Sequence, residues 1–510
     1  MSLAIRTALA SSRSAWRAST RRTTASTITI PTAQQKRGIS IQELDERRDR
    51  RERVVILGSG WAGYTLARDL DHRKYQTVVV SPRSYFVFTP LLASTSVGTL
   101  EFRLTLEPVR HRNQRVSFFQ GWADAVDFEK KELAIEEAVE DPYQGTALVS
   151  DRHEGRDEEL KVQKQKGKVF GLAYDKLVIA VGCFSETFGT PGVKEHAYFL
   201  KDVGDARKIR NRLLSCFETA ALPTTSAAMK KQLLNFAVVG GGPTGIEWSA
   251  ELHDMIHEDM ARLYPELLQY AHITVYDVAP KVLSMFDDKL AGYAMKAFAR
   301  QGIAIRTNHH VESLRRGAPG PIEQRDDVKE SATCYTLTLK EEGEVGVGMC
   351  VWSTGLMMNP FVEKALDGKV RRHPRSHGIL TTDKLEAKRN TDDDSTVPDV
   401  YALGDCAILE GTAYPATAQV ASQKATWLAK RFNRGDLHEN GFTYKDLGVM
   451  AYVGNWNAIL QSQGGDISGR VAWFIWRGAY LAKSVSWRNR ILIPIYWLVN
   501  WVFGRDISRF

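Results

Sequence analysis

The sequence predicts an α/β protein with two Rossmann-like dinucleotide-binding domains, followed by a C-terminal amphipathic region. Two observations indicate this architecture. A G-x-G-x-x-G run occurs twice, at residues 58–63 and 240–245, each time between a short apolar strand and a helix-like stretch. Residues 471–510 then mix aromatic, aliphatic and basic side chains and contain a single acid, Asp506.

The composition and the distribution of charge exclude several classes of protein. With 43% hydrophobic and 25% charged residues, the chain is neither wholly disordered nor a polytopic membrane protein. The formal net charge of +8 is concentrated in two tails: residues 1–42 hold seven basic residues and no acid, and residues 471–510 hold six basic residues and one acid. The part between them therefore carries about −4. We expect no nucleic-acid partner.

The N-terminal tail has the composition of a targeting segment. Residues 1–42 are rich in Arg, Ser, Thr and Ala and contain no acid, which is typical of a mitochondrial transit peptide. Their apolar runs are too short for a secretory signal, and a disordered basic arm is the alternative. The five cysteines are widely separated and form no C-x-x-C pair, so neither a disulfide scaffold nor a metal site is expected.

The first glycine run has the order of a βαβ unit. An apolar strand is expected at residues 54–57, a helix extends to Leu70, and a second strand follows at residues 77–80. In the loop, which includes Ser59, Gly58 permits a tight turn, Gly60 lets the backbone approach a pyrophosphate, and Gly63 lets the helix pack on the strand. The unit ends at Ser81-Pro82-Arg83 without an acid, so its ribose contact is unassigned.

The second glycine run repeats this order and adds an acid. A strand at residues 236–239 precedes Gly240, Gly242 and Gly245, and a longer helix is expected to reach about Tyr270. The next strand, residues 272–276, ends on Asp277. A carboxylate at this place accepts both ribose hydroxyls and repels a 2′-phosphate, which indicates NADH and not NADPH.

Three further strands end on glycine. Gly182 and Gly355 follow apolar strands that would return the chain between the domains close to a cofactor. Gly404 and Asp405 follow a third strand, and Asp405 is placed to accept a flavin ribityl hydroxyl, with a helix N-cap as the alternative. The predicted domains are 53–195 and 366–435 for FAD, 196–365 for NADH, and 436–510 for membrane anchoring.

The end of the chain holds a candidate exit for electrons. Gln419 and Gln423 are four residues apart and share one face of a predicted helix, where two amides could bind a quinone carbonyl, although exposed glutamines are the more ordinary interpretation. The uncharged stretch at residues 491–504 is shorter than the about 20 residues that cross a bilayer. We expect interfacial helices on an anionic membrane, with a homodimer or core-packing seam as the alternative.

These residues resemble the type II NADH:quinone oxidoreductases, the single-chain alternative NADH dehydrogenases of mitochondria and bacteria, which have a two-dinucleotide-binding flavoprotein fold. The resemblance covers about residues 53–510. Its motifs are at residues 58–61, 81–86, 88–92, 239–247, 402–405 and 417–423.

The resemblance implies how the site is divided. FAD would bind the first fold, with Pro90 among its contacts, and NADH the second, with Gly242 and Glu247 near the nicotinamide. Gln419 and Gln423 match the quinone-site glutamines of the family, so with Glu247 they become the candidate catalytic residues. Electrons would pass from NADH through FAD to ubiquinone without proton pumping. The implied location is peripheral on the mitochondrial inner membrane, and the matrix side is weakly favoured.

Two other functions remain open at this point. A sulfide:quinone oxidoreductase shares the architecture but uses cysteines beside the flavin, for which Cys183 and Cys350 are the candidates. A signalling flavoprotein of the apoptosis-inducing-factor type would oxidise NADH slowly, but it would need a basic folded surface that the acidic middle of this chain does not provide.

Overall fold

The computed structural model describes residues 40–110, 116–139, 145–150, 167–320, 333–484 and 486–509. It separates into two compact units, residues 1–49 and 50–510. The described part of the first unit is helix α1 (Ile41–Glu46), closed by a capping box in which Ser40 and Glu43 bond to each other's backbone N–H. All but the last residues of the predicted transit peptide, residues 1–42, lie outside the described residues.

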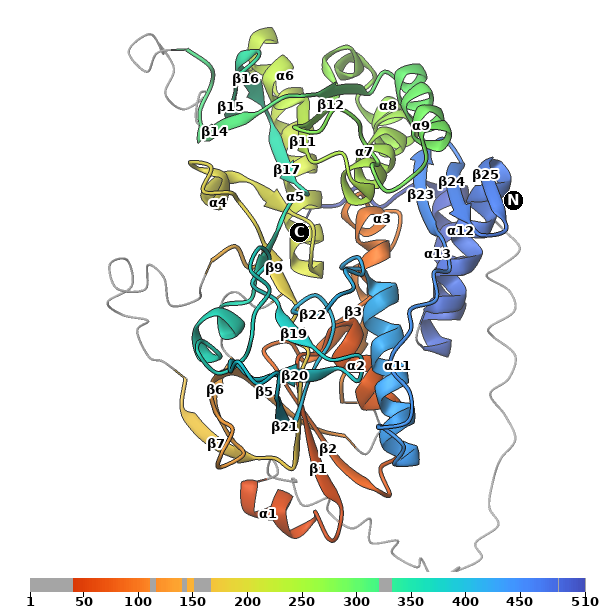
Figure 1. The fold of residues 1–510 in the computed structure, drawn as a ribbon. Helices are drawn as coiled ribbons and strands as arrows, with labels where there is room; N and C mark the ends of the chain where they lie inside the picture. The colour runs from red at the N-terminus through yellow and green to blue at the C-terminus, as the bar shows by residue number, and fades with distance from the viewer. Residues whose placement is uncertain are drawn as a thin grey trace, which may run out of the picture. The chain divides into compact units, whose positions relative to one another are not determined.

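The first sheet of the second unit is mixed, and its centre is parallel (Figure 1). Its parallel part consists of β21, β8, β1, β2 and β5, and its antiparallel edge consists of β5, β6 and β7, with the bounds given below. The central strands are apolar and buried on both faces, as a covered parallel sheet requires. In sheet order the strands are β22 (Ala407–Leu409), β19 (Ile379–Thr381), β20 (Glu386–Lys388), β21 (Thr396–Ala402), β8 (Lys176–Ile179), β1 (Glu52–Leu57), β2 (Tyr75–Ser81), β5 (Ser117–Asp127), β6 (Glu132–Glu137) and β7 (Val169–Ala173).

The second large sheet comes from the middle of the chain and is wholly parallel. Its strands, in order, are β10 (Tyr198–Phe199), β17 (Met349–Trp352), β11 (Asn235–Val239), β12 (His272–Asp277) and β13 (Ala304–Thr307). The first sheet thus uses strands from both sides of this segment, which is the order of two nested nucleotide-binding folds. The domain boundaries themselves stay a prediction.

Smaller sheets complete the strand set. Strands β9 and β18 pair antiparallel where the chain passes between the two folds. The smaller strands are β3 (Tyr85–Val87) with β4 (Leu106–Pro108), β9 (Cys183–Ser185) with β18 (Leu356–Met358), β14 (Val311–Arg316) with β15 (Tyr335–Leu339) and β16 (Gly343–Val347), and β23 (Val449–Gly454) with β24 (Asn457–Ser462) and β25 (Gly465–Gly469).

The helices follow the sequence prediction with one difference. The helix after the second glycine run, α7 (Pro243–Met255), does not continue to Tyr270. One π-helical turn and the short helix α8 (Ala261–Leu263) follow it. A 3-10 helix then begins at Pro265, where the proline ends the α-helical pattern. The α-helices are α2 (Trp61–Asp69), α3 (Leu92–Ser96), α4 (Val193–His196), α5 (Val203–Ala221), α6 (Ala227–Leu233), α7 (Pro243–Met255), α8 (Ala261–Leu263), α9 (Asp288–Gln301), α11 (Ala418–Arg434), α12 (Arg470–Lys483) and α13 (Trp487–Phe503).

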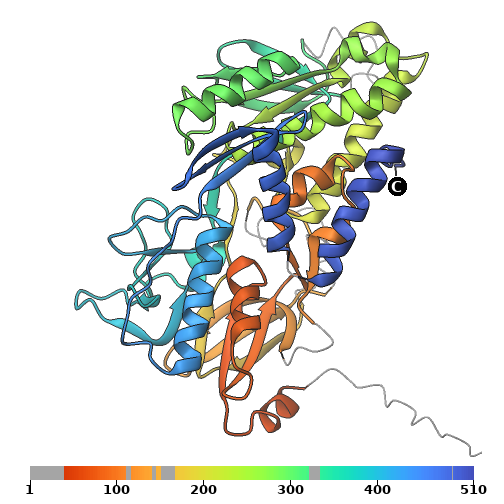
Figure 2. The same cartoon turned by 90° about the vertical axis from the view of Figure 1, so that its right-hand side faces the viewer.

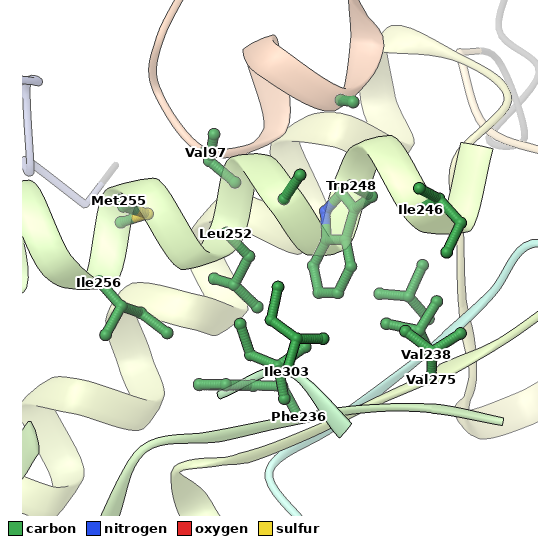
Figure 3. Close-up of a cluster of buried hydrophobic side chains, with 14 of the residues drawn as sticks. Val97, Phe236, Val238, Ile246, Trp248, Leu252, Met255, Ile256, Val275 and Ile303 are labelled. Carbon is green, nitrogen blue, oxygen red and sulfur yellow. The ribbon is translucent and has the colours of Figure 1, made fainter. Parts of the chain in front are cut away.

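Helix α7 is the centre of the core of the second fold. Figure 3 shows Trp248 and Leu252 pointing from α7 toward Phe236 and Ile303, while Val97 reaches the helix from the opposite side. All of these side chains are buried, and the Trp248 Nε1–H donates to Ser96 Oγ at 3.0 Å. Residues of the first fold therefore pack directly on the helix of the second glycine run.

The C-terminal helices are tied to both folds. Helices α12 and α13 lie side by side in both views (Figures 1 and 2). Three side chains form what we call the C-terminal clasp. Asn489 donates to Glu107 Oε1 at 2.8 Å, Asn500 donates to the Thr99 carbonyl at 2.8 Å, and Arg505 pairs with Asp259 at 2.5 Å. Glu107 and Thr99 belong to the part of the chain before the second fold, and Asp259 belongs to the second fold.

Candidate functional site

A cavity of about 410 Å³ lies at the carboxyl ends of the parallel strands of the first sheet. Parallel strands place the residues that follow them at one edge, which is where α/β proteins bind ligands. The walls come from the first glycine loop, the ends of β2 and β8, the segment after β21, and the second fold. The wall residues used below are Gly58, Ser59, Gly60, Arg83, Thr89, Gly182, Cys183, Lys201, Thr244, Gly355, Gly404 and Asp405.

The first glycine loop has the geometry that the sequence predicts. Gly58 has a φ of +107°, and a Cβ there would lie 2.2 Å from the Ala180 carbonyl oxygen. A Cβ on Gly63 would lie 2.0 Å from the Gly58 oxygen, so these two glycines are needed for the fold itself. A Cβ on Gly60 would meet nothing within 4 Å. Gly60 therefore leaves open space at the uncapped start of α2, where a phosphate fits.

The Ser59 side chain fixes this loop from within. Its hydroxyl lies 2.9 Å from both Ser81 Oγ and the Tyr85 carbonyl oxygen, and 3.1 Å from the Arg83 carbonyl oxygen. The hydroxyl is buried and already has protein partners. Its contribution to a nucleotide site is to hold the loop in shape, while the backbone of the loop lines the cavity.

The second glycine loop has the same glycine geometry as the first. Gly240 has a φ of +112°, and a Cβ on Gly245 would lie 2.0 Å from the Gly240 oxygen. Gly242 begins α7 without a side-chain cap, and a Cβ there would again meet nothing within 4 Å. Asp277 holds the tip of this loop: its carboxylate accepts from Gly241 N at 2.5 Å and from Ala279 N at 2.7 Å.

Of the other predicted cofactor residues, Gly182, Gly355, Gly404 and Asp405 border the cavity, whereas Pro90, Glu247 and Gln419 do not. Gly182, Gly355 and Gly404 all line it and all have φ between +67° and +82°. Pro90 lies in a short 3-10 turn (Thr89–Leu91) beside Thr89, which lines the cavity, but Pro90 itself is not in the wall. Thr89 Oγ1 accepts from Trp61 Nε1 at 3.0 Å, so the turn is fixed to the start of α2.

Asp405 and Cys183 meet in the cavity wall. The Asp405 carbonyl oxygen accepts from the Cys183 thiol at 3.1 Å, and Asp405 does not cap a helix. Burial raises the pKa of the Asp405 carboxyl, while Lys201 and Lys424 oppose that change. Burial also raises the pKa of the Cys183 thiol to about 12, with a smaller contribution from Asp405. Cys183 is therefore a neutral thiol and not a reactive thiolate.

Glu247 lies on α7 but faces the C-terminal region and is not in the cavity wall. Its Oε1 accepts from Tyr452 N at 3.1 Å and from Trp476 Nε1 at 3.2 Å. Burial raises the pKa of the Glu247 carboxyl to about 8, and these two hydrogen bonds only partly oppose the shift. The carboxyl is thus mainly protonated at neutral pH.

The glutamine pair is on one face of α11, as expected, and both amides are engaged. Gln423 bonds the backbone of Lys445 twice, donating at 2.8 Å and accepting at 3.0 Å. Gln419 Oε1 accepts from the Tyr444 hydroxyl and from Leu447 N, and its Nε2 donates to the Gly448 oxygen. The pair holds residues 444–448 against the helix, a contact that the sequence does not reveal.

Comparisons with known proteins agree with this geometry. Residues 52–425 match the family described as pyridine nucleotide-disulphide oxidoreductase, and residues 447–506 match the NDH2 C-terminal domain. A probable NADH dehydrogenase of Dictyostelium discoideum is 37% identical over 481 residues, which is 93% of each chain. An internal alternative NAD(P)H-ubiquinone oxidoreductase of Solanum tuberosum is 37% identical, covering 90% of this chain and 88% of that one.

The chain belongs to the type II NADH dehydrogenase family. The resemblance stated from the motifs is thereby confirmed. Among solved structures, NDH2 from Plasmodium falciparum has the same fold, with a TM-score of 0.76 at 23% identity over 90% of this chain and all of that one. The predicted fold class is confirmed as well.

The sulfide:quinone alternative is less well supported. A sulfide:quinone oxidoreductase from Aquifex aeolicus shares the fold at a TM-score of 0.59 and 16% identity. Its relation to this type II family member is more distant, and the cysteines do not converge. Cys350 is fully buried in β17 and does not line the cavity that Cys183 borders.

The surface of the C-terminal region is unusually apolar. Within the described residues, no helix has the length and apolar character needed to cross a membrane. Helices α12 and α13 nonetheless expose eleven large hydrophobic side chains, which we call the α12–α13 apolar face. They are Val471, Phe474, Ile475, Trp487, Ile491, Ile495, Leu498, Val499, Trp501, Val502 and Phe503.

Proposed function

We propose that this chain is an FAD-dependent NADH:ubiquinone oxidoreductase that does not pump protons. One observation carries the proposal. Thr244, at the start of α7 in the second glycine loop, lines the same cavity as Gly60 in the first. A nicotinamide bound at the second loop would therefore lie close to a flavin bound at the first, as direct hydride transfer requires.

The first loop fits FAD by its shape and its donors. The open space at Gly60 and the free N–H groups of α2 suit the diphosphate, and Asp405 is free to accept ribityl hydroxyls. Bound FAD would supply hydride acceptance and two-electron transfer, and the chain's own residues bind it, orient it and exclude water. Gly182, Gly355 and Gly404 allow the backbone to approach it closely.

The second loop fits NADH. Gly242 leaves the start of α7 open for the second diphosphate, and Asp277 lies at the loop tip where the adenine ribose is expected. Its carboxylate favours ribose hydroxyls over a 2′-phosphate. Glu247, one turn into α7, holds a proton on its carboxyl below about pH 8 and is our candidate to supply one during quinone reduction.

Ubiquinone would bind between α11 and residues 444–448. Gln419 and Gln423 position this segment, and their amides are the polar groups that a quinone carbonyl would meet if the segment moves. Relatives with internal or external ubiquinone oxidoreductase activity in mitochondria support this acceptor.

The α12–α13 apolar face would seat the enzyme on the membrane. Exposed Trp and aliphatic side chains near Lys483, Arg488 and Arg490 suit the interface of an anionic bilayer. Arg477 adds to this arrangement because its guanidinium lies 4.3 Å from the rings of both Trp473 and Trp497, which joins the two helices. We assign the protein to the mitochondrial inner membrane as a peripheral protein.

The side of the membrane is proposed from the relatives. Internal plant enzymes are 37% identical to this chain, whereas an external plant enzyme is 30% and an external yeast enzyme 34% identical, which favours the matrix side. NADH oxidation by intact mitochondria tests this directly: activity that appears only after permeabilisation supports the matrix side, and activity on added NADH before it refutes the assignment.

Light scattering in detergent tests the alternative in which the apolar face forms a homodimer.

Purified protein in mild detergent tests the activity. We expect a flavin spectrum that NADH bleaches and a short-chain ubiquinone restores. Asp277→Ala should narrow the preference for NADH over NADPH by about tenfold or more, because it removes the repulsion of a 2′-phosphate. Slow NADH oxidation that does not respond to quinone would contradict the proposed function, and equal wild-type rates with NADPH would remove the role given to Asp277.

A further inference from the structure

Lys201 has a fixed backbone at the point where the chain enters the second fold. It directly precedes Asp202, the N-cap of α5. The buried Asp205 carboxylate accepts from Lys201 N at 3.1 Å, from Asp202 N at 2.8 Å and from Ala147 N at 2.9 Å. The start of the Lys201 side chain is therefore held in one place by hydrogen bonds that do not involve its ammonium.

The ammonium of Lys201 is enclosed and has no hydrogen-bond partner in the described part of the chain. Lys201 lines the cavity, and its Nζ is shielded from solvent. Burial lowers the pKa of this ammonium, against the opposite influence of Cys183 and Asp405. A buried cation without a partner is costly, so its persistence here indicates a ligand that supplies the missing negative charge.

None of the acidic groups around Lys201 forms an ion pair with its ammonium in the described part of the chain. Asp202 is taken by Arg83, at 2.5 Å, and by the Tyr85 hydroxyl. Asp205 is used by the backbone donors above. Cys183 is a neutral thiol, and Asp405 forms no ion pair within 4 Å among the residues that the structure describes.

We propose that Lys201 binds the diphosphate of FAD together with the open start of α2, which lines the same cavity. The inference rests on the proposed function, since it needs FAD in this cavity. The diphosphate carries two negative charges, and the α2 N-terminus alone offers backbone dipoles and no full charge. Among the described residues of the cavity wall, Lys201 is the cation whose charged nitrogen has no protein partner, whereas the Arg83 charge is balanced by Asp202.

The position of Lys201 gives the contact a second effect. The residue belongs to the crossing between the two folds, one residue before the cap of α5. Binding of FAD at Lys201 therefore ties the cofactor to a segment that Asp205 already holds in place, and it links occupancy of the first site to the segment through which the second fold is attached.

The test measures FAD release from the purified holoenzyme. Free FAD fluoresces after dilution, so its release rate is read directly for wild type, Lys201→Met, Lys201→Arg and the control Lys208→Met, which alters an exposed lysine on α5. A charge-assisted hydrogen bond is worth about ten- to a hundredfold in binding, so we expect Lys201→Met to release FAD that much faster. Lys201→Arg and Lys208→Met should stay within about threefold of wild type.

Three readouts separate this contact from a structural role. Excess FAD should restore the thermal stability of Lys201→Met by mass action, and the flavin midpoint potential should not change. Raising the pH should speed FAD release from wild type as the ammonium is lost, but not from Lys201→Arg. If Lys201→Met does not fold, Lys201→Gln replaces it.

The opposite results are equally clear. Release at the wild-type rate from Lys201→Met would overturn the inference while leaving the proposed function intact. A shifted midpoint potential with unchanged release would place Lys201 at the flavin ring and also overturn it. Wild-type protein that purifies without FAD and does not bind added FAD would instead overturn the proposed function.

Discussion

Replacing Glu247 by glutamine should make the protein more stable at alkaline pH and leave it unchanged in acid. The carboxyl is buried, and its pKa rises from an ordinary 4.5 to about 8. A carboxyl whose pKa is higher in the folded protein favours folding in its protonated form. Its favourable contribution is therefore complete below about pH 4.5 and is lost as the pH rises through about 8.

The size of this effect follows from the shift. Each pKa unit corresponds to about 1.4 kcal/mol, so the cost of ionising Glu247 approaches about 5 kcal/mol as an upper limit, and relaxation of the site reduces it to a few. Glutamine keeps the oxygen that accepts from Tyr452 N and Trp476 Nε1, and it never ionises. Glu247→Gln should thus gain a few kcal/mol of unfolding free energy at pH 9 and about none at pH 5.

The assay is chemical denaturation of the holoenzyme at pH 5, 7 and 9, with exposed Glu266→Gln as the control. A stability difference between Glu247→Gln and wild type that does not grow with pH would refute the reasoning. In turnover, the same variant should reduce ubiquinone more slowly while NADH still bleaches the flavin, because only proton supply is removed.

The other predictions concern the loops, the glutamines and the apolar face. Gly60→Ala should fold but lose FAD, because its Cβ enters the open space that the diphosphate needs. Gly63→Ala should destabilise the first fold, because its Cβ would lie 2.0 Å from a carbonyl oxygen. Flavin absorbance per protein and melting temperature distinguish the two variants. Gln423→Ala should raise the KM for ubiquinone several-fold without altering reduction of a small soluble electron acceptor, and equal changes for both would contradict the quinone assignment. Leu498→Glu, on an exposed position of α13, should weaken sedimentation with anionic vesicles by about tenfold at unchanged melting temperature.

Local sequence predicted the parts of the site that depend on backbone geometry. The two glycine loops are recognisable because a positive φ and a 2.0 Å approach admit only glycine, and such constraints appear as a fixed pattern within six residues. The acid at Asp277 follows from the same unit. For these residues the chemistry is encoded next to the strand that positions it.

The roles that depend on distant contacts could not be predicted. Glu247 is buried by Tyr452 and Trp476, more than 200 positions away, so nothing near it in sequence indicates its raised pKa. Gln419 and Gln423 matched the family motif, yet their bonds to residues 444–448 arise only from folding. Lys201 had no motif to mark it, because its distinguishing property is a missing partner.

The C-terminal clasp has a mechanical consequence. Asn489 and Asn500 hold α13 to the first fold, and Arg505 holds the end of the same helix to the second. If α13 rests in the bilayer, a rotation that widens the space between the two nucleotide sites must either break one of these contacts or move the α13 aromatic side chains through the lipid headgroups. The resistance of the lipid headgroups to this movement would then slow the exchange of NADH, and turnover would depend on lipid packing as well as on substrate concentration.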